Sequence, residues 1–319
     1  MADNTITLTG AGPSGSSQGA GFDAVKTRKQ WQVVLRRFVR HRLAMAGLVV
    51  FFLLVLFAFL GDYLWKYDAS QLNLGRYQPP NPDHPFGTGR IGDDVFAKVI
   101  RGTDFSLRIA LVVAFIATTV GVILGAIAGF YRGWVDSLLS RFTDLVLVLP
   151  AFVMVAVLAR SSYSTEEISR GGGTSNWLTV AIFLGLTNWM TISRTIRGMV
   201  LSLREKEFVE AARALGGGPL RIVFRHILPN TVDVIIVNAT IAIAQAVLLE
   251  AALSFVGLGV KYPDTSLGLL INENQNELVV HPWLFYFPFL FIVLISLSVN
   301  FIGDGLRDAF DPRQKRVRA

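Results

Sequence analysis

Cysteine is absent from this sequence, and only 17% of its 319 residues are charged. Without cysteine the chain has no disulfide, no thiolate metal site and no cysteine nucleophile. The few histidines are scattered, at His41, His84, His226 and His281. They form no H-E-x-x-H pattern, and the Gly-Lys dipeptide of a P-loop does not occur. We therefore predict no catalytic residue, metal site or cofactor on this chain, and expect partner subunits to hold any ATP and Mg²⁺.

Apolar residues make up 52% of the chain, and the mean hydropathy of +0.49 is too high for a soluble domain. A helix that spans a bilayer needs about 20 mostly apolar residues. Runs of this kind predict an all-α membrane protein with six transmembrane helices, over 43–60, 106–131, 138–159, 177–193, 232–256 and 278–303. The third run contains charged residues and a proline, so we expect a kinked helix packed inside a bundle.

The segments before the first apolar run differ from it in composition. Residues 1–23 are rich in Gly, Ser and Thr and predict a disordered cytoplasmic tail. Residues 24–42 combine an apolar helical face with several arginines, which predicts a basic amphipathic helix lying on the lipid membrane. A helix packed on a partner protein is the alternative for this segment.

Lys and Arg are concentrated in three segments, namely 1–42, 191–231 and 304–319. The positive-inside rule then places both termini in the cytoplasm and makes 61–105 an extracytoplasmic loop. Residues 304–319 become a cytoplasmic tail. The net charge of +7 is thus a signal of membrane topology, and we predict no binding to nucleic acid.

The long loop 197–230 predicts two helices with a break between them. Ser202 is placed to cap a first helix over 203–215. Gly216, Gly217 and Gly218 would end that helix, and Pro219 suits the first turn of a second helix that runs to about residue 228. From the residues alone, a basic amphipathic hairpin on the inner leaflet is an equally good interpretation.

The same loop carries a motif, formed by Glu210, Ala211, Ala212, Gly216, Leu228 and Pro229. Its spacing resembles the E-A-A signature of membrane subunits of binding-protein-dependent ABC importers. His226 stands where the general signature has isoleucine, but the string R-H-I-L-P-N is similar to the C-type subunit of the dipeptide, oligopeptide and nickel permeases. Further similar stretches lie at 84–96, 248–260 and 300–312.

This resemblance implies the type I ABC importer permease fold, with the transmembrane domain over 106–303 and the helix 43–60 as an added anchor. It implies that 197–230 is a cytoplasmic coupling hairpin that docks on an ATP-binding subunit. The residues expected to act in coupling are Glu210, Ala211, Ala212, Arg213, Gly216, Leu228 and Pro229. Further implied partners are a second homologous permease subunit and an extracytoplasmic peptide-binding protein, in a bacterial-type plasma membrane.

The function implied by the resemblance is the import of short peptides driven by ATP. Import of nickel or another small solute by the same machinery is an alternative. An ion-coupled secondary transporter is an alternative from a different class. The external loop 61–105 is then either a segment near the binding protein or a lid that tethers the first helix to the others.

Four glycines recur at intervals of four, at Gly121, Gly125, Gly129 and Gly133. They share one helix face and predict close helix packing, either static or moving during transport. Two carboxylates lie in or near the predicted fifth helix. Glu250 is a possible path or gate residue or a hydrogen-bonded group between helices, whereas Asp233 is near enough to the interface to be solvated.

Overall fold

The computed structural model describes residues 30–148, 150, 153, 154, 157, 177–262 and 264–310. Over these ranges every regular element is a helix, and one isolated β-bridge joins Thr88 to Asp94. The predicted tail 1–23 lies outside the described residues, as does the part of the predicted tail 304–319 after residue 310.

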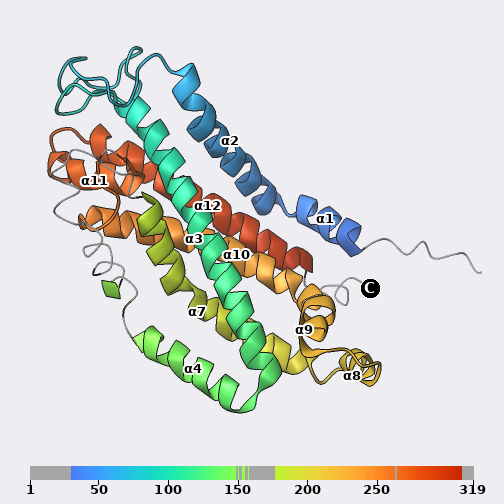
Figure 1. Ribbon diagram of the computed structural model, residues 1–319. Coiled ribbons are helices and arrows are strands. Elements are labelled where there is room, and N and C mark those ends of the chain that lie inside the picture. Colours follow the sequence, from blue (N-terminus) through green and yellow to red (C-terminus); the bar gives the residue numbers. More distant parts are fainter. Residues whose placement is uncertain are drawn as a thin grey trace, which may run out of the picture.

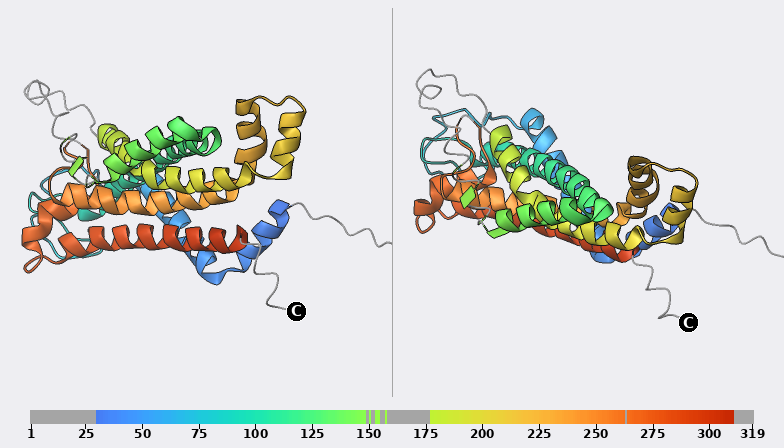
Figure 2. Two further views of the ribbon diagram at one scale, coloured as in Figure 1. Left: turned by 90° about the horizontal axis from the view of Figure 1, so that it is seen from below. Right: turned by 60° about the horizontal axis from the view of Figure 1, so that its bottom comes forward.

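Five long helices run side by side: α2 (Arg42–Leu64), α3 (Val95–Tyr131), α7 (Trp177–Leu203), α10 (Val232–Phe255) and α12 (Trp283–Phe310) (Figure 1). The connection between α2 and α3 lies at one end of the bundle together with α11 (Leu267–Asn274). At the opposite end lie α1 (Gln30–Arg40), α8 (Glu207–Ala214) and α9 (Pro219–Ile222), as both views in Figure 2 show. The chain therefore places its short helices at the two ends of the bundle.

Within the described residues, α2, α3, α10 and α12 are long and apolar enough to cross a membrane. The predicted fourth span lies in α7, and the predicted third span begins inside α4 (Gly133–Val148) and continues past the described residues. Helices α4 and α7 do not meet the same criterion of length and hydropathy, so the count of six spans stays a prediction.

Some helices differ in their bounds from the predicted spans. The second long helix begins at Val95, eleven residues before the predicted start at 106. Its first turns contain Lys98 and Asp104, whose charges lower the hydropathy of this stretch. Lys98 pairs with Asp93 and Asp104 with Arg108, each at 2.8 Å. The last long helix begins at Trp283 instead of residue 278 and extends to Phe310.

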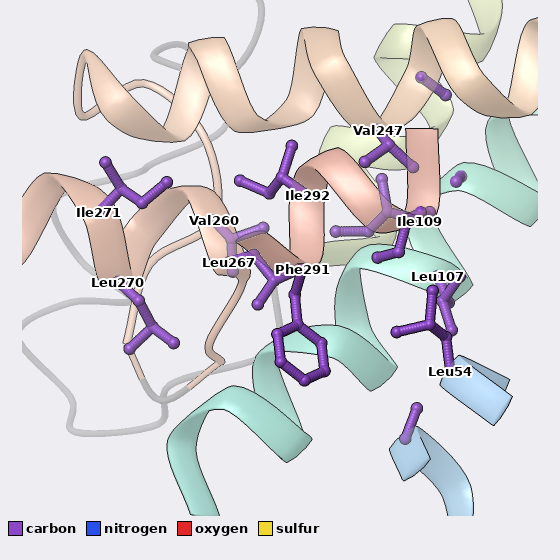
Figure 3. Packing of buried hydrophobic residues seen from close by; sticks show 14 of the residues in the cluster. Leu54, Leu107, Ile109, Val247, Val260, Leu267, Leu270, Ile271, Phe291 and Ile292 are labelled. Carbon is purple, nitrogen blue, oxygen red and sulfur yellow. The ribbon is translucent and has the colours of Figure 1, made fainter. Parts of the chain in front are cut away.

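Two large apolar clusters form the core. The first joins α2, α3, α7, α10, α11 and α12, and Figure 3 shows part of it around Leu107, Ile109, Val247, Phe291 and Ile292. The second lies between α3, α7 and the hairpin that follows α7. A smaller third cluster packs Phe38 of α1 against Ala309 of α12. The predicted amphipathic helix is therefore held against the bundle through its apolar face.

Close packing of α3 against α7 depends on glycine. A Cβ atom at Gly121, Gly125 or Gly129 would lie only 2.8, 2.5 or 2.8 Å from a backbone carbonyl oxygen of α7. Gly133 does not belong to this contact, because it opens α4 with φ +66° and has no heavy atom within 4 Å of its Cβ position. The four-glycine packing face is therefore wrong at Gly133. At the other three positions the helix backbones touch.

The connection 65–94 is fixed to the start of α3 by Asp94. The carboxylate of Asp94 accepts hydrogen bonds from the indole of Trp65 at 2.7 Å and from the backbone N–H of Ala97 at 3.0 Å. His84 lies 2.8 Å from its other oxygen. Because the Ala97 bond satisfies one of the free N–H groups at the helix end, Asp94 is the N-cap of α3.

Candidate functional site

The hairpin that follows α7, residues 204–230, contains the sequence motif identified above. Here α7 continues to Leu203, and α8 starts only at Glu207 after a turn. The predicted cap at Ser202 is therefore wrong, because Ser202 lies inside α7. The break after α8 agrees with its glycines, since Gly216 has φ +78°, a conformation that favours glycine over residues with a side chain.

The second arm of the hairpin is irregular. After the single turn of α9, residues 223–227 form a π-helical turn and residues 228–230 a 3₁₀ turn. Pro229 has no N–H and cannot continue an α-helical hydrogen-bond ladder, which accounts for the change of winding. The carbonyl of Leu228 instead accepts from both the backbone N–H and the hydroxyl of Thr231, each at 2.9 Å. Leu228 and Pro229 thus form the junction between the hairpin and α10.

Apolar packing attaches the hairpin to the ends of α3 and α7. Val209 of α8 and Ile227 of the second arm are fully buried, and they belong to the same cluster as Phe130 of α3 and Val200 of α7. Burying a large aliphatic side chain contributes roughly 1.5–3 kcal/mol. The hairpin is therefore part of the α3–α7 body and has no separate core.

Polar contacts reinforce this attachment. Arg132, just after α3, forms an ion pair with Glu205, and Arg204 donates a hydrogen bond to the carbonyl of Phe130. Hydrogen bonding to Arg132 lowers the pKa of Glu205 below its ordinary value. The guanidinium of Arg213 lies 5.6 Å from the ring centroid of Phe130, within the range of a cation–π contact. Arg213 therefore faces the body of this chain.

The outer surface of the hairpin is exposed and partly apolar. Glu210 and Ala211 are exposed, and Ala212 is half-buried. Large apolar side chains that sequence reasoning missed are also exposed: Leu215 by 89%, Leu220 by 64%, Phe224 by 61% and Phe208 by 39%. Exposed apolar side chains of this size make the hairpin a candidate protein interface. The signal that could have identified them is their position in a loop that carries many charged residues.

Glu250 lies at a junction of three segments inside the bundle. Its side chain is 1% exposed and accepts hydrogen bonds from Ser254 at 2.7 Å and Ser106 of α3 at 3.2 Å. Ser106 in turn accepts from the backbone N–H of Leu267, at the start of α11, at 3.2 Å. The structure thus places Glu250 in a closed hydrogen-bonded network. Asp233, by contrast, lies in the first turn of α10.

Metal-ligating residues do not gather in the part of the chain that the structure describes. Across those ranges, no three His, Cys, Asp or Glu side chains form a group that could hold a metal ion.

The sequence matches two families of known proteins. Residues 121–316 match "Binding-protein-dependent transport system inner membrane component", and residues 29–80 match "N-terminal TM domain of oligopeptide transport permease C". The oligopeptide transport system permease protein OppC of Mycobacterium bovis is 38% identical over 287 residues, which cover 90% of this chain and 96% of that protein. OppC of Bacillus subtilis is 34% identical over 299 residues, covering 92% and 94%.

The fold is similar to that of a solved transporter. A chain of the MetNI methionine ABC transporter, in an inward-facing conformation, superimposes with a TM-score of 0.52 and 19% identity. The match covers 67% of this chain and 96% of that chain, and it concerns the fold alone. The hairpin and the α3–α7 contact from Gly121 onward both lie within the first matched family region. The chain belongs to the family of binding-protein-dependent transport system inner membrane components and has the fold of a type I ABC importer permease.

Proposed function

We propose that this chain is a permease subunit of an ATP-driven importer of short peptides. The observation that carries this proposal is similarity over nearly the whole chain to two proteins named as oligopeptide permeases. The second family match, to the N-terminal segment of oligopeptide transport permease C, supports it because it includes α1 and α2, which lie outside the common transport region.

The hairpin 204–230 is the proposed docking site for an ATP-binding subunit. Glu210, Ala211, Ala212 and Gly216 supply a small, accessible surface there, and Leu215 and Leu220 add apolar contacts. Because the hairpin shares its core with α3 and α7, a displacement of the docked subunit would be transmitted to both helices. Arg213 would support the hairpin through Phe130, and Leu228 and Pro229 would transmit the motion to α10.

The other proposed partners follow from the family. A second homologous permease subunit would complete the path, and an extracytoplasmic peptide-binding protein would deliver the substrate. ATP and Mg²⁺ would be bound by the ATP-binding subunits. The hairpin and both termini would lie on the cytoplasmic side, which agrees with the positive charge of these segments.

The first test is purification of the tagged chain from native membranes in mild detergent. We expect a second permease and ATP-binding subunits to copurify in fixed ratio. The complex, reconstituted with its binding protein, should take up a labelled dipeptide only when ATP is supplied. Transport by the chain alone, without ATP-binding subunits, would favour a secondary transporter, and uptake of Ni²⁺ without peptide uptake would favour the nickel alternative.

A further inference from the structure

A polar cavity of about 320 Å³ lies between α3, α4 and α7. Its lining includes Asp144 of α4 together with Ser193, Arg194 and Arg197 of α7. The volume is at the lower end of the range for small-molecule sites. Such a cavity accommodates a few polar atoms of a ligand more readily than a large side chain.

The two arginines of the cavity lining each form an ion pair, and the two pairs differ in exposure and in the number of their hydrogen bonds. Arg197 donates two hydrogen bonds to Asp136, at 2.5 and 2.8 Å, and the hydroxyl of Ser140 donates a third at 3.2 Å. The Asp136 side chain is only 17% exposed. Its oxygens are thus occupied within this chain, and this pair joins α4 to α7.

The second pair, Arg194 with Asp144, is more exposed and has fewer hydrogen bonds than the first. It has a single contact, and the two side chains are 54% and 60% exposed. Arg194 lies nine residues before the end of α7, about 14 Å along the helix axis from the hairpin. Arg194 follows the predicted fourth span and Asp144 lies near the start of the predicted third, so both charges lie near the end of the bundle that carries the hairpin, where water can reach them.

We propose that Arg194 and Asp144 form a subsite for the two charged termini of a short peptide on the translocation path. This inference rests on the proposed function. The peptide carboxylate replaces Asp144 on the guanidinium, and the peptide ammonium replaces Arg194 on the carboxylate. Each charge keeps an opposite partner during the exchange.

The chemistry of the termini suits a transporter of varied peptides. All peptides share a backbone and two termini, whereas their side chains differ, so recognition of the termini does not restrict the sequence. A guanidinium binds a carboxylate through two parallel hydrogen bonds. An extended chain advances about 3.5 Å per residue, so the charges of a di- or tripeptide lie about 7–10 Å apart. Two half-exposed side chains on facing helices can separate to that distance.

The absence of cysteine provides a direct test. Asp144→Cys gives the chain a single thiol, which is labelled in the reconstituted complex with a cationic, membrane-impermeant methanethiosulfonate. We expect labelling of the assembled complex, and slower labelling during ATP-driven transport of Ala-Ala. Leu145→Cys is the matched control, because Leu145 is adjacent, 69% exposed and outside the cavity lining. Equal labelling of Asp144→Cys with and without Ala-Ala would overturn the proposal.

Variants at Arg194 give a second, independent measurement. At saturating peptide-loaded binding protein, Arg194→Gln should lower the initial rate of Ala-Ala uptake about tenfold, the size expected for loss of one charge-assisted contact. Arg194→Lys should retain part of the uptake, and both variants should keep the thermal stability of the complex, because the pair is exposed. Unchanged uptake by Arg194→Gln would refute the subsite. Absence of Ala-Ala uptake by the unmodified complex would instead refute the proposed function itself.

Discussion

The carboxylate of Glu250 accepts a hydrogen bond of 2.7 Å from the hydroxyl of Ser254, one turn further along α10. Together with Ser106 at 3.2 Å, this contact connects α10 to α3 within the buried core. The residue that the sequence offered as a possible gate is therefore engaged on two sides.

Removal of this carboxylate should destabilise the bundle. Glu250→Ala leaves two buried hydroxyl groups without their acceptor, and each unsatisfied group costs about 1–3 kcal/mol. We expect a clear fall in the thermal unfolding midpoint of the detergent-solubilised complex, and a smaller fall for Glu250→Gln, whose amide oxygen still accepts. Glu210→Ala is the control, because Glu210 is exposed and should affect uptake without changing the midpoint.

The glycine contact between α3 and α7 predicts a pair of opposite outcomes. A Cβ at Gly125 would meet the carbonyl oxygen of Ser193 at 2.5 Å and Ile196 at 3.1 Å, so Gly125→Ala should push the helices apart and cost about 1–3 kcal/mol. Gly198→Ala, where no heavy atom lies within 4 Å, should be neutral or slightly stabilising. Thermal unfolding of the two variants measures the difference. Equal stabilities would contradict the close contact.

The hairpin break provides a test of coupling. Gly216→Asp should abolish ATP-linked uptake while membrane insertion continues, because the variant changes the proposed docking surface and its charge. Gly216→Asn distinguishes the effect of an added side chain on the surface from the effect of a strained backbone. Asparagine tolerates the left-handed conformation that Gly216 adopts at φ +78°. We expect Gly216→Asn to retain more uptake than Gly216→Val. Normal uptake by the Asp variant would rule out docking at this position.

The end of the bundle opposite the hairpin should be sensitive to acid. Hydrogen bonds from His281 at 2.8 Å and Tyr77 at 2.9 Å hold the pKa of Glu277 below its ordinary value. A lowered carboxyl pKa in the folded state contributes stability above the unfolded value of 4.5, and that stability is lost as the pH falls through the folded value.

Unfolding midpoints measured between about pH 3.5 and 7 test this contribution. The native chain should lose stability below about pH 4.5 more steeply than Glu277→Gln, which cannot titrate. Parallel pH profiles for the two proteins would mean that Glu277 contributes nothing to the acid sensitivity.

Sequence patterns were most informative where one residue type has one structural consequence. Gly216 ended its helix, and Pro219 began the next one, because backbone geometry decides both. Sequence patterns failed where contacts with residues outside the segment decide its secondary structure. The charged residues in the first turns of α3 favoured a loop there. In the structure Lys98 pairs with Asp93 and Asp104 pairs with Arg108, so these charges do not prevent the helix.

Other features had no signal in the sequence. Pro229 marks where the second arm ends, but no pattern predicted the short length of α9 or the π-helical turn that follows it. Likewise, Gly133 has the spacing of the other three glycines but lies beyond the C-cap of α3 at Arg132. A periodicity of four says which residues share a face only as long as the helix continues.

Asp94 connects the two ends of the segment 65–94. Trp65 at its beginning, His84 near its end and the first turn of α3 all contact this one carboxylate. The two ends of this connection are consequently held together at the start of α3. Asp68 and Ser70 are exposed and take no part in these contacts, so we expect an epitope inserted there to leave the start of α3 unchanged.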